Sequence, residues 1–257
     1  MLKGLYTAHT GLVNEQYRMD IMSNNLANSS TVGFKKEGST SETFDAVLAY
    51  RLKDTTDVGN FPKRIGFNNP GVKIGEVYND FTQGPFQITD NTYDLALGGE
   101  GFFTIEFRNK AGVTSTKYTR AGDFTLNTSG YLVTKDGDYV LGTNGRIRLD
   151  PNTETEINKD GSIVQDGRTV ARLRISDFQD YDYLVKYGET YFETVDGFRT
   201  KPAEAEVFSG YLEASNVQVV SEMVDMINIT RAYESNQKIM QTYDSTLEIA
   251  ATQLGRV

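Results

Sequence analysis

Cysteine is absent from this chain of 257 residues, and histidine occurs only once, as His9. Disulfides and thiolate metal sites are therefore excluded, and nucleophile arrangements that need Cys/His or Ser/His/Asp have almost no material. His9 lies at the edge of an apolar helical stripe, where a single histidine is typical of an interface or surface residue rather than a ligand or a base. The sequence thus predicts no catalytic centre, no metal site and no cofactor.

Long apolar runs and clusters of Lys and Arg are missing as well. No run approaches the roughly 20 apolar residues that a membrane-spanning helix needs, so no membrane insertion is expected. The net charge of −9, without a basic cluster, argues against binding to nucleic acid. The first five residues lack the apolar stretch of a cleaved signal peptide. We therefore expect a protein that stays in the cytoplasm or leaves it by a route that reads no cleaved signal.

Apolar residues recur every seven positions towards the C-terminus. One line is Met226, Tyr233, Met240, Leu247 and Leu254, and a second line beside it, broken at one polar position, is Ile229, Asn236, Tyr243 and Ala250. This pattern is typical of a helix that packs along a partner helix. Ser215 and Gln218 are spaced as a capping box at its start. No Pro or Gly interrupts residues 216–254, so the helix would be on the order of 60 Å long.

The N-terminus carries a matching seven-residue pattern. Its main line is Leu5, Leu12, Met19 and Leu26, and its companion line is Ala8, Glu15 and Met22. The simplest arrangement pairs the two terminal helices as a coiled coil, with the middle of the chain as an insertion. The alternative is two ordinary amphipathic helices packed on a globular core.

The first helix is predicted to run from about Leu2 to Ala27, where asparagines gather. Asn24, Asn25 and Asn28 are poor helix-interior residues, and Gly33 can take a positive φ. Two interpretations stay open at this point. The asparagines form a plain helix stop, or their amides donate hydrogen bonds to neighbouring chains in a packed bundle.

The middle of the chain changes character twice. Residues 37–70 show no clean period and include loop signals at residues 53–57 and 68–71, so an extended connector is expected there. From Val72 the period becomes two, and short β-prone runs alternate with turn pairs such as Asp136-Gly137 and Asn144-Gly145. Such pairs predict consecutive hairpins of an antiparallel all-β domain. The expected strands cover residues 73–78, 94–97, 102–106, 124–126, 131–133, 139–141, 147–149, 163–165, 170–175, 191–192 and 207–208.

The predicted fold class is therefore α+β, with N- and C-terminal helices that pair as a coiled coil around an inserted β domain. We expect four parts: residues 1–36 form the first helix, 37–71 the connector, 72–209 the β domain and 210–257 the second helix.

Two further stretches resemble chemical motifs without satisfying them. Gly99-Glu100-Gly101 lacks the third glycine of a dinucleotide loop and precedes a strand instead of a helix, so a tight hairpin is predicted. Asp177, Asp180 and Asp182 do not have calcium-loop spacing and are expected in a solvated loop. A glycosidase-like carboxylate pair stays open as an alternative, although nothing singles out its members.

Several motifs together resemble the bacterial flagellar rod and hook protein family. The N-terminal motif is Ser23-Asn24-Asn25-Leu26-Ala27-Asn28, followed by Val32-Gly33-Phe34-Lys35. The C-terminal motif is Gly210-Tyr211-Leu212-Glu213-Ala214-Ser215-Asn216-Val217, followed by Arg231-Ala232-Tyr233-Glu234. Between them, Gly101-Phe102-Phe103 and Tyr118-Thr119-Arg120-Ala121-Gly122 are similar to the β domain of the rod proteins. The likeness spans nearly the full chain and is weakest over residues 39–70.

The resemblance implies a structural subunit that is not an enzyme. Such a subunit would polymerise helically through its terminal helices into the hollow drive shaft and export channel of the flagellar basal body. Its partners would be other copies, other rod and hook subunits, and the flagellar export apparatus. It would lie within the cell envelope after export without a cleaved signal.

The opening Lys3-Gly4-Leu5-Tyr6 and the ending Gln253-Leu254-Gly255-Arg256-Val257 look more like a proximal-rod protein. A distal-rod or hook-type subunit, and a cell-wall hydrolase with paired carboxylates, remain as alternatives. The assembly interface would comprise Leu5, Leu12, Met19, Asn24, Asn25, Leu26, Asn28, Val217, Val220, Met226, Ile229, Tyr233, Asn236, Met240, Tyr243, Leu247 and Leu254.

Overall fold

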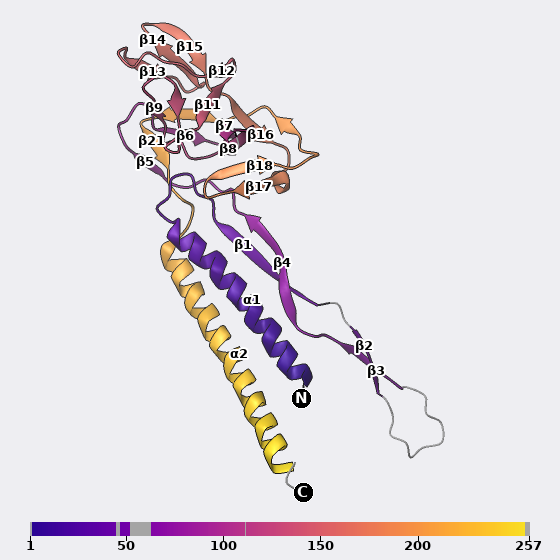
Figure 1. Cartoon of the computed structure of the whole chain (residues 1–257). Coiled ribbons are helices and arrows are strands. Elements are labelled where there is room, and N and C mark those ends of the chain that lie inside the picture. The colour runs from indigo at the N-terminus through magenta and orange to yellow at the C-terminus, as the bar shows by residue number, and fades with distance from the viewer. Residues whose placement is uncertain (1, 45–46, 52–62, 111, 255–257) are drawn as a thin grey trace. The chain divides into compact units, whose positions relative to one another are not determined.

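The computed structural model describes residues 2–44, 47–51, 63–110 and 112–254 (Figure 1). The chain divides into two compact units. Unit 1 comprises Met1–Leu26, Glu37–Tyr78 and Val219–Val257, and unit 2 comprises Ala27–Lys36 and Asn79–Gln218. The fold class is α+β as predicted, with a terminal helix on each side of a mostly antiparallel β domain in the chain.

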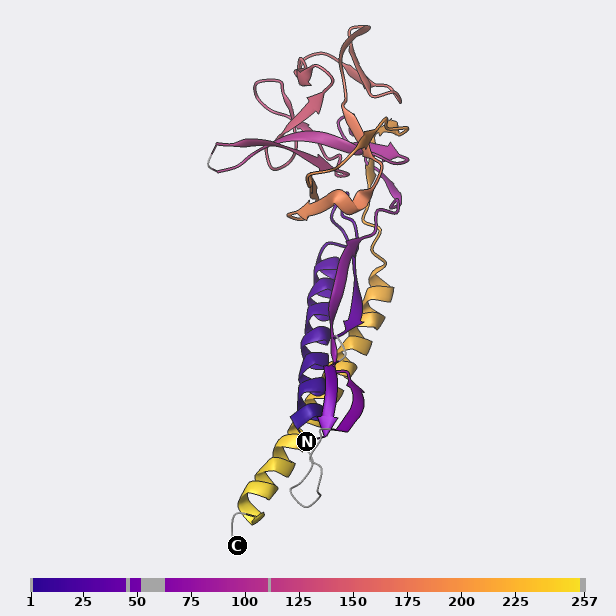
Figure 2. The same cartoon turned by 90° about the vertical axis from the view of Figure 1, so that its right-hand side faces the viewer.

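Unit 1 contains both long helices. Helix α1 covers Leu2–Ala27, as predicted, and α2 covers Val219–Leu254. With 36 residues, α2 is about 54 Å long. The two helices lie side by side in both views of the molecule (Figures 1 and 2). They run in opposite directions, because Gly4 on α1 lies against Tyr243 and Gly11 lies against Asn236.

The start of α2 differs from the predicted capping box. The helix begins at Val219 instead of directly after Ser215, and the Ser215 Oγ accepts a hydrogen bond from the Val217 N–H at 3.3 Å. The reason lies in Asn216, whose amide oxygen accepts from the Lys36 N–H while its Nδ2 donates to the Asp80 carbonyl. These bonds hold residues 215–218 outside the helix.

Unit 1 also contains four strands, three of which lie where an extended connector was expected, while the fourth matches the strand predicted over residues 73–78. Strand β1 (Glu37–Thr43) pairs with β4 (Val72–Asn79), and β2 (Val47–Arg51) pairs with β3 (Lys63–Asn68). The predicted loop at residues 53–57 lies outside the described residues. The connector is thus in part a paired β structure that belongs with the helices.

Unit 2 is built from short strands around one larger sheet. Its strands are β5 (Phe86–Ile88), β6 (Leu95–Gly98), β7 (Phe102–Arg108), β8 (Thr114–Thr119), β9 (Thr125–Leu126), β10 (Leu132–Val133), β11 (Tyr139–Gly142), β12 (Gly145–Arg146), β13 (Thr155–Ile157), β14 (Ser162–Gln165), β15 (Arg168–Arg172), β16 (Ile175–Phe178), β17 (Leu184–Tyr187), β18 (Tyr191–Thr194), β19 (Thr200–Lys201), β20 (Glu206–Ser209) and β21 (Tyr211–Glu213), with one 3-10 turn at Tyr181–Tyr183.

The ten-stranded sheet has the order β17-β18-β8-β7-β11-β10-β9, with β12, β16 and β19 attached at its side. Strands β13, β14 and β15 form a second sheet, and β20 pairs with β6 while β21 pairs with β5. Two apolar clusters fill the unit. The larger one includes Phe103, Phe124 and Leu132, and the smaller one is mainly aromatic, around Phe102 and Phe192. Burying each large side chain stabilises the fold by about 1.5–3 kcal/mol.

The turn signals predicted most of the hairpins. Asp136-Gly137 connects β10 to β11, Asn144-Gly145 closes β11 on β12, and Asp166-Gly167 connects β14 to β15. The prediction of a tight hairpin at residues 98–101 was wrong. Strand β6 pairs with β20, and β7 pairs with β8, β11 and β16, so residues 98–101 lead from one sheet to another.

Other strand predictions need smaller corrections. Residues 147–149 carry only an isolated bridge at Arg148, and the single strand expected over residues 170–175 is divided between β15 and β16. Among the described residues, no helix is long and apolar enough to cross a membrane.

Candidate assembly interface

The predicted apolar lines of α1 and α2 face the interior of unit 1. The step of seven residues from Gly4 to Gly11 on α1 is matched by a step of seven back along α2, because Gly4 lies against Tyr243 and Gly11 against Asn236. The glycines permit this close approach, since a Cβ at Gly11 would lie 3.0 Å from Asn236 Nδ2. Ile229 is buried, and the following predicted residues are half-buried: Leu5, Leu12, Met19, Leu26, Met226, Tyr233, Asn236, Met240 and Tyr243.

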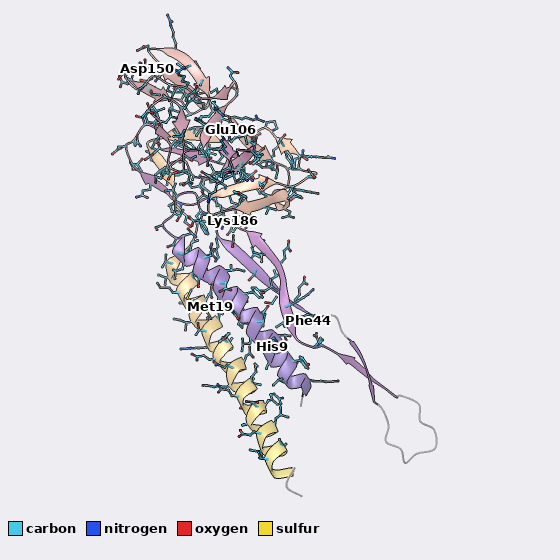
Figure 3. The ribbon with its side chains drawn as sticks, in the orientation of Figure 1. His9, Met19, Phe44, Glu106, Asp150 and Lys186 are labelled. Carbon is cyan, nitrogen blue, oxygen red and sulfur yellow. The ribbon has the colours of Figure 1, made fainter. Side chains whose placement is uncertain are left out.

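Three predicted positions on α2 stand apart from this arrangement. Val220 is 77% exposed, and Leu247 is 37% exposed. Leu254 is the last residue of α2, and its side chain lies outside the described part of the chain. Figure 3 labels Met19, which represents the α1 line, on the ribbon of that helix.

A buried polar contact closes the seam at the end of α1. Asn25 is fully buried, its Nδ2 donates to the Glu37 carbonyl at 2.8 Å, and its Oδ1 accepts from the Glu37 N–H at 2.9 Å. The same Nδ2 lies 3.4 Å from the Glu222 carboxylate, which is also fully buried. Glu222 was missed from the sequence, although it lies seven residues before Ile229 and so continues that line.

The other asparagines do not act as one group. Asn28 is buried in unit 2, where its Oδ1 accepts from the Thr31 hydroxyl at 3.1 Å, while Asn24 is exposed. Within the subunit, Asn25 and Asn28 therefore use hydrogen bonds inside the chain. Val217 is buried in unit 2 as well.

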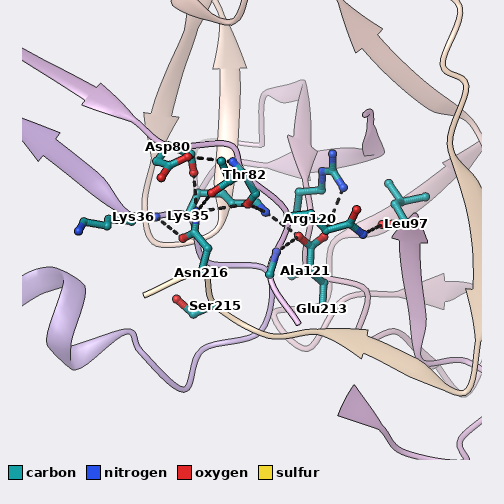
Figure 4. Close-up of polar contacts among 12 residues, drawn as sticks. Lys35, Lys36, Asp80, Thr82, Leu97, Arg120, Ala121, Glu213, Ser215 and Asn216 are labelled. Carbon is teal, nitrogen blue, oxygen red and sulfur yellow. Dashed lines mark hydrogen bonds and ion pairs between the residues drawn. The ribbon is translucent and has the colours of Figure 1, made fainter. Parts of the chain in front are cut away.

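Unit 2 fixes the segment that follows α1 to the segment that precedes α2 (Figure 4). Lys35 Nζ lies 2.6 Å from Glu213 Oε1 and donates to the Thr82 carbonyl at 2.8 Å. Arg120 Nη1 lies 3.3 Å from Glu213 Oε2. The Glu213 carboxylate also accepts from the Gly84 N–H at 3.0 Å. Two cations and a backbone donor therefore share one buried carboxylate.

The charge balance of this cluster is unusual for a protein interior. The side chains of Lys35 and Glu213 are fully buried, and that of Arg120 is nearly so. Burial lowers the pKa of the Lys35 ammonium, and the charge of Glu213 acts in the opposite direction. Charged groups in an interior need such partners, because an unpaired buried charge is strongly destabilising.

Gly33 allows the same segment to approach the sheet. Its φ is +69°, and its N–H donates to the Glu213 carbonyl at 2.8 Å. A Cβ at this position would overlap the backbone of Arg120 and Ala121. The sequence indicated the positive φ at Gly33, but not the cluster, because its members come from three distant parts of the chain.

The acidic and histidine side chains considered as catalytic or metal-binding candidates do not form a catalytic arrangement in the described part of the chain. Asp177 is buried, contrary to the prediction of a solvated loop, because its carboxylate accepts from the Tyr181 hydroxyl at 2.9 Å and pairs with Lys201 at 3.1 Å. His9 is exposed on α1, as expected. Within the described ranges, no group of His, Cys, Asp and Glu is arranged to hold a metal ion.

A second apolar stripe on α2 was predicted only at Val220, as a single interface residue. Val220, Met223, Val224 and Ile227 are all exposed, and we call them the α2 stripe. The spacing of 220, 224 and 227 is a helical-face signal that could have been recognised. Met223, Val224 and Ile227 were missed because the heptad lines account for their neighbours Met226 and Ile229.

Family models match three separate parts of the chain, including both helices. The model described as Flagella basal body rod protein matches residues 5–35. The model of the Flagellar hook protein FlgE/F/G D1 domain matches residues 96–165. The model of the Flagellar basal body rod FlgEFG protein C-terminal matches residues 209–254. The three matches occur in the order in which the resemblance placed the motifs.

Individual relatives match over the full length. The flagellar basal-body rod protein FlgF of Caulobacter vibrioides is 34% identical, and the alignment covers all of both chains. The rod protein FlgG of the same organism is 34% identical, with 98% of this chain and 99% of the relative covered. The flagellar hook-basal body complex protein FlhO of Bacillus subtilis is 30% identical over all of both chains. The chain therefore belongs to the flagellar basal-body rod protein family.

Proposed function

We propose that this chain, a structural subunit of the flagellar basal-body rod by its family, belongs to the proximal part of the rod. In this proposal the subunits polymerise helically through their terminal helices into a hollow shaft that also serves as an export channel. Family membership makes it a structural protein of the basal body, not an enzyme, and implies contacts with other rod and hook subunits.

One observation carries the proposal that the terminal helices assemble. The helices of unit 1 cover each other along one face only, so that the predicted seam residues are mostly half-buried and the α2 stripe remains exposed. Large exposed apolar patches are uncommon on monomeric proteins and mark interaction surfaces. A subunit whose helices pack against those of neighbours would bury this surface.

The coiled-coil pairing of α1 and α2 is part of the proposal. The contacts of Gly4 with Tyr243 and of Gly11 with Asn236 support it, because they lie seven residues apart on both helices, as heptad pairing requires. The division of labour follows from it. Residues 1–36 and 210–257 would form the inner, assembling part, residues 37–71 a connector, and residues 72–209 an outer β domain. Of the predicted interface residues, Asn25, Asn28 and Val217 would then support the subunit from inside.

The proximal position rests on the two ends of the chain. Its opening and its ending resemble proximal-rod proteins more than distal-rod proteins. Percentage identity does not distinguish a proximal from a distal position, because relatives named FlgF and FlgG are both 34% identical to this chain. We further propose that the flagellar export apparatus secretes the chain without a cleaved signal, and that the absence of cysteine suits this passage, since no disulfide has to be reduced.

Electron microscopy of basal bodies from a strain that lacks this gene tests the proposed function. If the chain is a rod subunit, its loss should leave a rod that stops short inside the envelope and carries no hook. A proximal subunit leaves a shorter stub than a distal one. Complete rods and hooks in the deletion strain would contradict the proposal. Restoration by the wild-type gene on a plasmid is the control for effects on neighbouring genes.

A further inference from the structure

The side-chain amide of Asn216 connects three separate parts of unit 2. Its Oδ1 accepts a hydrogen bond from the Lys36 N–H at 2.8 Å, and its Nδ2 donates to the Asp80 carbonyl at 2.8 Å and to the Thr82 carbonyl at 3.2 Å. The Asp80 N–H also donates to the Lys36 carbonyl at 2.8 Å. One half-buried amide therefore binds backbone groups that lie 180 and 136 positions away in the sequence.

Buried contacts next to this amide join the same parts of the chain. The Gly33 N–H donates to the Glu213 carbonyl at 2.8 Å. The Lys35 ammonium lies 2.6 Å from the Glu213 carboxylate and donates to the Thr82 carbonyl at 2.8 Å (Figure 4). All the residues of this group belong to unit 2, and we call them the clamp: Gly33, Lys35, Lys36, Asp80, Thr82, Glu213 and Asn216.

Clamp residues are close in sequence to every point where the chain passes from one unit to the other. Helix α1 ends at Ala27 and strand β1 begins at Glu37, on either side of the first clamp residues. Strand β4 ends at Asn79, directly before Asp80. Helix α2 begins at Val219, shortly after the last clamp residue. The clamp therefore binds together the segments from which both long helices start.

The bonds of the clamp depend on unit 2 and not on the helices of unit 1. They use backbone groups and side chains of unit 2, where Lys35 and Glu213 are fully buried. The seam of unit 1 is mostly half-buried by comparison. Two segments that short tethers hold together have an effective concentration on the order of millimolar. Part of the entropy cost of bringing the helices together is then met by the folding of unit 2.

We infer that the clamp holds the ends of α1 and α2 together in the free subunit, before the helices are ordered, with Asn216 as its positioning residue. The two helices then order as a pair when the subunit joins the rod. The inference rests on the proposed function, since it specifies how unit 2 prepares the helices for assembly. It gives unit 2 a task in assembly besides that of an outer domain.

Two alanine variants test the role of Asn216. Asn216→Ala removes the hydrogen bonds that connect distant parts of the chain. Asn127→Ala is the control, because Asn127 is also half-buried in unit 2 and accepts from the Ser129 and Tyr131 N–H groups at 3.0 and 2.9 Å, within one local turn. Near-ultraviolet circular dichroism shows whether unit 2 is folded. Asn216→Asp, which keeps the acceptor for Lys36 and removes the donor, is tested in parallel in case Asn216→Ala folds poorly.

Pulsed electron paramagnetic resonance measures whether the helix ends are held together in dilute monomer. The natural chain contains no cysteine, so Ser30→Cys and Gln218→Cys give two specific sites for spin labels, and both positions are exposed in unit 2. The inference predicts one narrow distance distribution in the labelled parent chain and in Asn127→Ala, and a broad one in Asn216→Ala. A narrow distribution in folded Asn216→Ala, or a broad one in the parent chain, would overturn the inference.

Incorporation into rods is measured by detecting each variant, without the labelling cysteines, in isolated basal bodies. Asn216→Ala should be recovered at about one tenth of the natural level or less, because tethering two binding segments favours their association by ~10²–10⁴. Asn127→Ala should be recovered normally. Normal recovery of Asn216→Ala despite a broad distance distribution would overturn the inference, and so would an unfolded unit 2 in both Asn216 variants, since the amide would then serve the fold alone. Absence of the natural chain from basal bodies would instead contradict the proposed function.

Discussion

Glu213 is the residue on which the junction of unit 2 depends. Its buried carboxylate contacts Lys35 at 2.6 Å, Arg120 at 3.3 Å and the Gly84 N–H at 3.0 Å. Replacement by glutamine keeps the size of the side chain and removes the charge that both cations need. We predict that Glu213→Gln lowers the free energy of unfolding by about 3–5 kcal/mol, measured by urea denaturation.

The same change at Glu206 provides a matched control. Glu206 lies on the neighbouring strand β20, and its pair with Lys159 at 3.5 Å is largely exposed on both sides. Glu206→Gln should therefore change the free energy of unfolding by no more than about 1 kcal/mol. Equal losses in the two variants would show that the buried cluster is not what holds the junction.

Gly33 makes a second residue-scale prediction. Alanine at this position must adopt φ +69° and place its Cβ against the backbone of Arg120 and Ala121. Gly137 has a φ of +90° but open space around it. Gly137→Ala therefore measures only the cost of a positive φ for alanine, about 1–2 kcal/mol, without any steric overlap. Thermal unfolding followed by circular dichroism should show Gly33→Ala to be clearly less stable than Gly137→Ala. Similar melting temperatures would contradict the close packing at Gly33.

Sequence reasoning found the backbone requirement at Gly33 but not its neighbours. A positive φ is a local property, so composition and spacing can indicate it. The contact between Glu213 and Arg120 joins residues 93 positions apart. Buried ion pairs of this kind depend on the complete fold, and no local pattern marks them. The same reason explains why Asp177 was expected in solvent.

At the scale of the elements, assembly depends on the apolar faces of the two long helices. Tyr233 and Met240 lie on the α2 line that faces the interior of unit 1 and are half-buried there. A carboxylate at either position would have to lose its water in an apolar seam, which is costly. We predict that Tyr233→Asp or Met240→Asp abolishes incorporation into rods while unit 2 stays folded. Incorporation is measured by detecting the subunit in isolated basal bodies.

The control uses an exposed position on the same helix. Gln237→Asp introduces the same charge one turn away from Met240, at an exposed position. This variant should incorporate normally, and near-ultraviolet circular dichroism should show an intact β domain in all three proteins. Normal incorporation of Tyr233→Asp would show that the seam is not part of the assembling surface.

Element-level predictions succeeded where the signal was local. The seven-residue lines identified the inward faces of α1 and α2, and Asp-Gly and Asn-Gly pairs identified several hairpins. The hairpin at residues 98–101 failed because β6 pairs with β20, whose residues lie far along the chain. Apart from Val220, the α2 stripe was overlooked because one helix carries two apolar faces, and the heptad pattern describes only one of them.

At the scale of the whole molecule, the two units differ in how well each buries its apolar residues. Unit 2 has two buried clusters, whereas the helices of unit 1 keep much of their apolar surface exposed. Ordering a long helix costs about 1–2 kcal/mol per residue in backbone entropy, and half-covered seams offset that poorly. We therefore predict that the terminal helices of a dilute monomer are largely disordered and become ordered on assembly.

Hydrogen exchange across residues 226–247 tests this central claim most directly, with dilute monomer and isolated rods compared under the same conditions. The account predicts fast exchange of these amides in the monomer and strong protection in the rod. Unit 2 provides the internal control, because its core strands should be protected in both. Strong protection of residues 226–247 in the dilute monomer, equal to that in the rod, would contradict the claim that assembly completes this part of the structure.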